Sequence, residues 1–86
     1  MELNETFKAL GDENRLSILN SLTEKERCAC HILEELEISQ PTVSHHLKLL
    51  CEVELITCRV EGKWKHYQIN PNKVKELIQY LEGLIK

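Results

Sequence analysis

The sequence predicts a small, mainly α-helical domain that contains one β-hairpin. Apolar residues recur at helical spacing in five stretches of the chain, whereas residues 56–69 alternate with a period of two. The chain has 86 residues, and a second hydrophobic core would need roughly 50 more. We therefore expect residues 1–86 to form a single domain, which at this size is a candidate for stabilisation by a second subunit.

The composition excludes several classes of protein. No apolar run approaches the roughly 18 residues of a membrane span, and the first ten residues hold two Glu and no apolar signal region. We expect a cytoplasmic protein without membrane contact, in which four cysteines act as free thiols, metal ligands or redox switches. Because the chain has no Gly-rich phosphate loop, catalytic Cys-His-Asn pattern or paired-carboxylate site, we do not expect an enzyme.

The first 37 residues predict three helices. The first covers residues 2–10 and ends at Gly11, and Asp12 is placed to cap a second helix that ends near Thr23. Residues 24–27 are a charged connection to a third helix over residues 28–37. The apolar positions are Leu3, Phe7 and Leu10 in the first helix, Leu16, Leu19 and Leu22 in the second, and Ile32, Leu33 and Leu36 in the third.

A fourth helix follows after a short join, with Ser39 or Gln40 as its cap and Pro41 in its first turn. Its buried stripe is expected at Val43, Leu47 and Leu50, with His46 at the edge of the core, while Pro41, Ser44, His45 and Lys48 face solvent. Two helices joined in this way, the second with small polar and basic side chains outside, match the helix-turn-helix plan for reading a DNA groove.

A hairpin and a final helix complete the chain. Residues 56–60 and 63–69 alternate around Glu61-Gly62, so that Ile56, Cys58 and Val60 share an inward face. Asn70 is expected to cap the last helix and Pro71 to open it. Its apolar stripe is unusually rich, so we expect it to pair with a second copy of the chain, together with two residues of the first helix. The expected dimer residues are Leu3, Phe7, Val74, Leu77, Ile78, Leu81, Leu84 and Ile85.

The candidate DNA contacts lie on the fourth helix and on the hairpin. Short polar side chains let a helix approach base edges, and basic residues of a hairpin suit phosphates or the minor groove. The candidates are Gln40, Thr42, Ser44, His45 and Lys48 on the helix, and Arg59, Lys63, Lys65 and His66 on the hairpin. The net charge of −3 does not oppose this interpretation, because residues 1–38 carry −5 and residues 39–67 carry +1.

Three strings of the chain resemble the ArsR/SmtB family of metal-responsive repressors: KALGDENRL at residues 8–16, SQPTVSHHLKLL at residues 39–50, and EGKW at residues 61–64 followed by Tyr67. The resemblance implies a winged helix-turn-helix homodimer that binds double-stranded operator DNA without a cofactor. It also implies that the dimer leaves the DNA when an effector binds.

Cys28 and Cys30 are the candidate effector ligands, because the arsenic-sensing branch of that family places a Cys-x-Cys pair in this helix. Leu33 stands where some members have a third Cys, so a third ligand has to come from Cys58, Cys51 or the other subunit. Sulfur ligands suit As(III), Sb(III), Cd(II), Pb(II), Cu(I) or Zn(II). Positions i and i+2 of a helix point roughly 200° apart, so we expect binding to distort the first turn and tilt the reading helix.

Two other functions are compatible with the same residues. In the first, Cys28 and Cys30 form a thiol-disulfide switch on a DNA-binding repressor that needs no metal. In the second, the chain is a winged-helix interaction module that pairs through its last helix and does not bind DNA.

Overall fold

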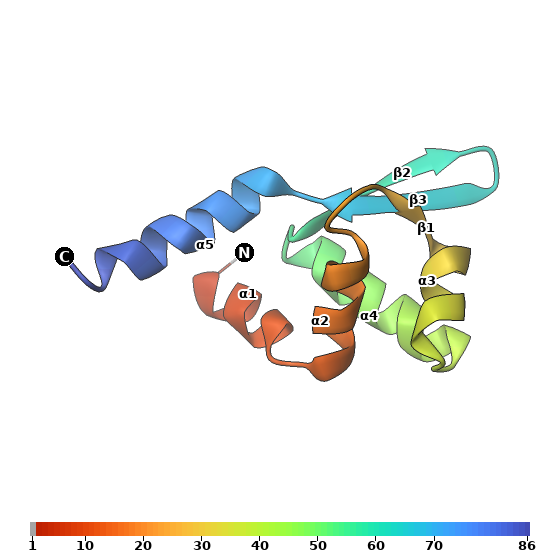
Figure 1. Ribbon diagram of the computed structural model, residues 1–86, viewed down its shortest axis with the longest axis horizontal. Helices are drawn as coiled ribbons and strands as arrows, with labels where there is room; N and C mark the ends of the chain where they lie inside the picture. Colours follow the sequence, from red (N-terminus) through yellow and green to blue (C-terminus); the bar gives the residue numbers. More distant parts are fainter. Residues whose placement is uncertain (1) are drawn as a thin grey trace.

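Five helices and three short strands follow one another in the computed structural model, which describes residues 2–86 (Figure 1). The first four helices pack together, and the sheet lies at one side of them. The elements are α1 (Leu3–Leu10), α2 (Glu13–Ser21), β1 (Arg27–Cys28), α3 (Ala29–Leu36), α4 (Gln40–Glu52), β2 (Ile56–Glu61), β3 (Trp64–Ile69) and α5 (Pro71–Gly83). The mainly helical winged helix-turn-helix fold is confirmed.

The N-terminal caps of α2 and α4 form as the local sequence predicts. The Asp12 carboxylate accepts hydrogen bonds from the backbone N–H groups of Asn14 and Arg15, at 2.9 and 3.1 Å. The Ser39 hydroxyl accepts from the N–H of Thr42 at the start of α4. Asn70 takes the expected N-cap position of α5, but its side chain makes no capping hydrogen bond. Its side-chain amide instead donates to the Glu54 carbonyl at 2.9 Å and ties the helix start to the turn between α4 and β2.

The sheet has a third strand that the sequence analysis missed. Strand β3 lies between β1 and β2, and Arg27 and Cys28 of β1 pair with Tyr67 and His66 of β3. Two residues are too few to show an alternation, so residues 24–27 appeared to be only a connection. The hairpin itself is confirmed, and Gly62 takes φ +60° at the first position of its two-residue turn, which suits a type II′ turn.

The buried stripe of α2 differs from the expected one. Ile18 is fully buried and Leu22 nearly so, whereas Leu16 is 46% exposed. A spacing of three residues drifts backward by about 60° per step, so Leu16 lies about 120° around the helix from Leu22, and Ile18 lies only about 40° away. The α4 stripe is confirmed, since Val43, Leu47 and Leu50 are all buried.

The inward face of the hairpin is covered only near its base. Ile56 is 1% exposed, but Cys58 is exposed and Val60 is 63% exposed. The expectation that Cys58 is buried on an inward face is therefore wrong, because the side chain is exposed. The outer half of the hairpin extends past the helices as a wing (Figure 1).

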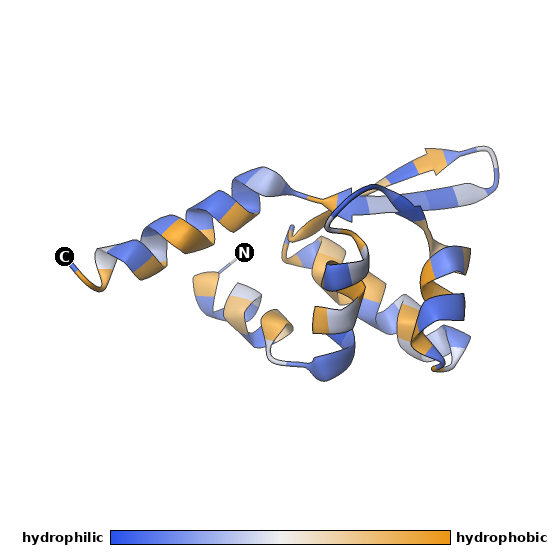
Figure 2. Ribbon diagram, viewed as in Figure 1, coloured by the Kyte–Doolittle hydropathy of each residue, from blue (hydrophilic) through white to orange (hydrophobic). Residues whose placement is uncertain are grey.

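Helix α5 leaves the body on the opposite side from the wing, and the molecule measures 45 × 23 × 23 Å (Figure 1). Apolar residues recur along this arm (Figure 2). Helix α5 contacts the body at Leu77, which enters the core, and at Tyr80, whose ring lies 5.7 Å from that of Phe7. Among residues 2–86 we find no helix with the length and apolar content that crossing a bilayer demands.

Candidate nucleic-acid interface and thiol site

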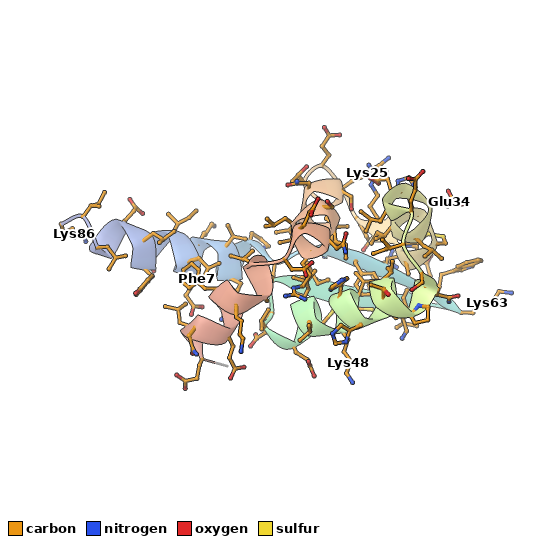
Figure 3. The ribbon with its side chains drawn as sticks, turned by 90° about the horizontal axis from the view of Figure 1, so that it is seen from below. Phe7, Lys25, Glu34, Lys48, Lys63 and Lys86 are labelled. Atoms are coloured by element: carbon orange, nitrogen blue, oxygen red, sulfur yellow. A yellow bond between two sulfur atoms is a disulfide. The ribbon has the colours of Figure 1, made fainter. Side chains whose placement is uncertain are left out.

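A groove of about 670 Å³ lies between α3, α4 and the wing. Five of the predicted DNA-contacting residues line it, three from α4 and two from the hairpin: Gln40, Ser44, Lys48, Lys63 and Lys65. In Figure 3, Lys48 projects from α4 and Lys63 from the wing tip, which places positive charge on both walls of the groove. This arrangement suits a phosphate backbone lying between a reading helix and a wing.

Trp64 lines the same groove and was not among the predicted contacts. Its side chain is 53% exposed beside the turn of the wing, and the Lys63 ammonium lies 5.9 Å from the centre of its ring. The sequence signal that could have pointed to Trp64 as a contact residue is an aromatic side chain at the tip of a hairpin, within the EGKW string.

Thr42 and His45 are exposed on α4 but do not line the groove. The Thr42 hydroxyl lies 2.7 Å from that of Ser39, at the exposed start of the helix. His46 is only 7% exposed, which confirms its expected place at the edge of the core. Arg15 donates to its Nδ1 at 3.2 Å, because a guanidinium has no acceptor, so α2 and α4 are joined through a buried imidazole.

Arg59, a predicted DNA contact, does not line the groove. Strand residues alternate between faces, so Arg59 lies on the face of the sheet opposite Cys58 and the groove. Its guanidinium binds both carboxylate oxygens of Glu26, at 2.7 and 3.2 Å, and one oxygen of Glu61 at 3.0 Å. The hydrogen bond from Arg59 holds the pKa of Glu26 below its usual value, and Glu26 in turn raises the pKa of Arg59. His66, which faces the same side, lies 4.0 Å from Glu61.

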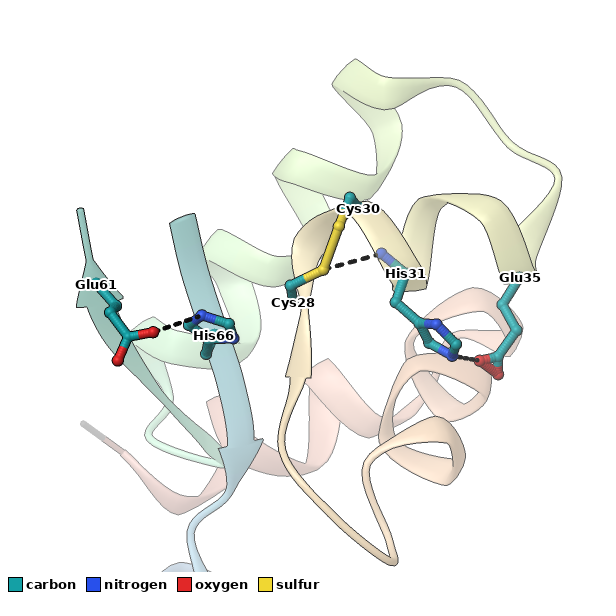
Figure 4. Close-up of a disulfide and its surroundings, with 6 residues drawn as sticks. All are labelled: Cys28, Cys30, His31, Glu35, Glu61 and His66. Atoms are coloured by element: carbon teal, nitrogen blue, oxygen red, sulfur yellow. Dashed lines mark hydrogen bonds and ion pairs between the residues drawn. A yellow bond between two sulfur atoms is a disulfide. The ribbon is translucent and has the colours of Figure 1, made fainter. Parts of the chain in front are cut away.

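Cys28 and Cys30 are brought together without any distortion of α3. Cys28 is the last residue of β1 and the N-cap of α3, with an extended backbone at φ −80° and ψ 157°. A disulfide joins it to Cys30, with 5.4 Å between the two Cα atoms (Figure 4). The expected 200° separation is wrong, because it assumed that both residues lie inside the helix.

The surroundings of this pair are polar. The N–H of His31 points at the Cys28 sulfur at 3.4 Å, and its imidazole lies 3.4 Å from Glu35 rather than turning toward the sulfurs (Figure 4). An N–H donor at a helix start stabilises a thiolate when the pair is reduced. Two adjacent sulfur donors therefore form a ready site for a thiophilic ligand.

The described part of the chain brings no third ligand to Cys28 and Cys30. Cys51 is half-buried and Cys58 exposed, and neither is bonded to another sulfur. Within residues 2–86, no three side chains of His, Cys, Asp or Glu lie close enough together to hold a metal ion.

The expected dimer residues fall into three groups by their exposure. Ile78 and Leu81 are half exposed on α5, and Leu84 and Ile85, in the turn that follows the helix, are 64% and 87% exposed. These four residues form an apolar strip at the C-terminal end of the chain. Leu77 is instead a core residue with 7% exposure, so the expectation that it lies in the dimer interface is wrong. The remaining three, Leu3, Phe7 and Val74, are partly buried.

Comparison with known proteins gives consistent results. A family profile described as "Bacterial regulatory protein, arsR family" matches residues 12–57, more than half of the chain. The chain is 44% identical over 81 residues to an uncharacterized HTH-type transcriptional regulator of Methanocaldococcus jannaschii, covering 93% of this chain and 91% of the relative. It is 45% identical over 80 residues to the arsenical resistance operon repressor of Staphylococcus aureus, covering 93% and 77%.

Solved structures agree on the fold. The crystal structure of an ArsR family transcriptional regulator, RHA00566, superposes with a TM-score of 0.90 and covers 95% of this chain and 90% of its own. The two sequences are only 20% identical, so this likeness concerns the fold alone.

Proposed function

The chain belongs to the arsR family of bacterial regulatory proteins, and we propose that it is a homodimeric repressor that leaves its operator when arsenite or a soft metal ion binds Cys28 and Cys30. As a member of this family it is a DNA-binding transcriptional repressor and not an enzyme, which sets aside the alternative of an interaction module that does not bind DNA. Arsenite is the first effector to test, because the S. aureus relative is named for arsenical resistance.

The observation that carries the effector site is the juxtaposition of two sulfurs at the junction of β1 and α3. In the reduced form, both thiols reach one ligand while α3 stays regular. Trivalent arsenic exchanges oxygen ligands for thiolates and releases water, and soft metal ions prefer the same donors. Residues 2–86 offer no third donor beside the two sulfurs. We therefore expect a complex with two sulfur ligands, in which an oxygen ligand or a residue of the partner subunit completes the coordination.

The position of Cys28 suggests how binding reaches the DNA. Cys28 pairs with His66 of β3, so an effector bound there touches the strand that forms the wing. On the other side, α3 leads into α4 through residues 37–39, and Glu37 adopts a left-handed φ of 51° in this join. A ligand that shifts the start of α3 therefore acts on both walls of the groove, because wing and reading helix are each one step away.

The test is a reduced Cys28→Ser, Cys30→Ser variant, assayed by fluorescence anisotropy on a duplex selected from a randomised pool. We expect it to bind the duplex like the wild type but to stay bound at arsenite concentrations that release the wild type. Cys51→Ser, Cys58→Ser is the matched control and should still be released. Loss of duplex binding in the first variant, or its release at the wild-type concentration, would overturn the effector site.

A thiol-disulfide switch is the second candidate, favoured by the bond between Cys28 and Cys30. It predicts release by peroxide, recovery by a dithiol, and no response to arsenite or Cd(II). The same anisotropy assay separates the two candidates.

A further inference from the structure

We propose that Cys51 and Cys58 form a second two-thiol site, separate from Cys28 and Cys30, that binds a trivalent arsenical or similar thiophilic ligand at the base of the wing. Cys51 lies in the last turn of α4, and Cys58 is the third residue of β2. Only a short turn separates the two elements, and both cysteines line the groove between α4 and the wing. This site stands independently of the effector site proposed above.

The surroundings of the two thiols indicate that they are neighbours. Tyr67 is the cross-strand partner of Cys58 and is 8% exposed. Burial, followed by the proximity of Cys58 and Cys51, raises the pKa of the Tyr67 hydroxyl to about 12. Burial also raises the pKa of Cys51, with a smaller contribution from Cys58, while the Lys65 ammonium opposes it. The two thiols thus share one environment, with a protonated phenol and a cation beside them.

Cys28 and Cys58, one cysteine from each pair, lie on opposite faces of the sheet. Cys28 is aligned with His66 and Arg59, whereas Cys58 is aligned with Tyr67 and Arg27, and adjacent rows of a sheet face opposite sides. Cys30 also lines the groove, but its sulfur is bonded to Cys28. Among residues 2–86, neither Cys51 nor Cys58 forms a three-ligand group with Cys28 and Cys30.

The exposure of the two thiols suits stepwise capture of a ligand. Cys58 is exposed and meets the ligand first, and the half-buried Cys51 closes the complex. With phenylarsine oxide, two As–S bonds replace the bonds from arsenic to oxygen, and the two thiol hydrogens leave with that oxygen as water. Arsenic stays trivalent, so the step needs no oxidant or reductant.

The experiment titrates phenylarsine oxide into the reduced chain and counts bound phenylarsenic groups by intact mass, with iodoacetamide reporting the remaining free thiols. Wild type should take two groups per chain. Cys28→Ser, Cys30→Ser should take one, with Cys51 and Cys58 both protected from alkylation. Cys51→Ser, Cys58→Ser should also take one, and the fourfold serine variant none.

A single change in the Cys28→Ser, Cys30→Ser background keeps the proposal testable if Cys51→Ser disturbs the core. Because Cys58 is exposed, Cys58→Ser leaves the packing of the core intact. It should still weaken the binding of phenylarsine oxide by about 100-fold or more, because the second thiol acts at high effective concentration. The inference is overturned if the background variant takes no group, or if Cys58→Ser leaves its affinity unchanged. If instead Cys51→Ser, Cys58→Ser takes none while Cys28→Ser, Cys30→Ser takes one, the effector site proposed above fails and this one stands.

Discussion

Removing two lysines from the wing should flatten the salt dependence of DNA binding. Lys48, Lys63 and Lys65 line the groove of one protomer, so a dimer offers six such side chains to phosphates. Each neutralised phosphate contributes about −0.9 to the slope of log K against log salt, which gives a slope of about −5 for six contacts. Lys63→Ala with Lys65→Ala leaves two contacts and a slope of about −2.

The measurement is anisotropy of a labelled duplex over a salt series. Wild type should lose about a thousandfold in affinity between roughly 50 and 200 mM salt, and the double variant only about tenfold. Lys25→Ala with Lys75→Ala removes the same charge from exposed positions outside the groove, so it serves as the matched control.

The two variants separate local contacts from general charge. If the groove binds the backbone, the wing variant flattens the slope and the control keeps the wild-type slope. An unchanged slope in the wing variant, or an equal flattening in the control, would contradict the assignment of this groove to DNA.

Four further predictions test the interface, the core, the dimer and the dependence of stability on pH. Trp64 is the only tryptophan, so its emission should change when the selected duplex binds, and an unaltered spectrum at saturation would exclude it from the interface. Leu77→Ala should lower the free energy of unfolding by about 2–4 kcal/mol in urea melts, because its side chain is buried. Leu81→Ala should instead raise the dimer dissociation constant in sedimentation, and a reversal of these two effects would contradict the proposed strip. The raised pKa of Tyr67, about 12 in the folded state, stabilises the fold below the unfolded value of about 10. This stability should be lost as pH rises through about 12, and Tyr67→Phe should remove that part of the decline in urea midpoints.

The sequence predicted α4 and the hairpin well because their signals are local. Ser39 caps the helix, Pro41 occupies its first turn, and Val43 begins a stripe of buried residues at regular spacing. Gly62 marks the turn because its positive φ is costly for other residues. Five of the DNA candidates lie together for the same reason, since all five belong to this helix and this hairpin.

The errors arose where tertiary contacts decide the local structure. Leu16 fits a helical spacing as well as Ile18 does, and only the packing of α2 decides which of them is buried. Arg59 is a basic residue on a hairpin, as a phosphate contact would be, but Glu26 from a distant segment binds it on the other face. The expected helix distortion at Cys28 failed because β1 pairs with β3 and leaves that residue outside α3.

Strand β1 changes how the proposed regulation can work. If Cys28 lay inside α3, an effector would have to unwind helical hydrogen bonds before it could affect the DNA interface. Because Cys28 ends a strand that pairs with His66, and Glu26 just before that strand binds Arg59 of β2, the effector site is already joined to both strands of the wing. In the mechanism we propose, a small change of the backbone at Cys28 moves the wing relative to α4, and the energetic cost of helix unwinding is avoided.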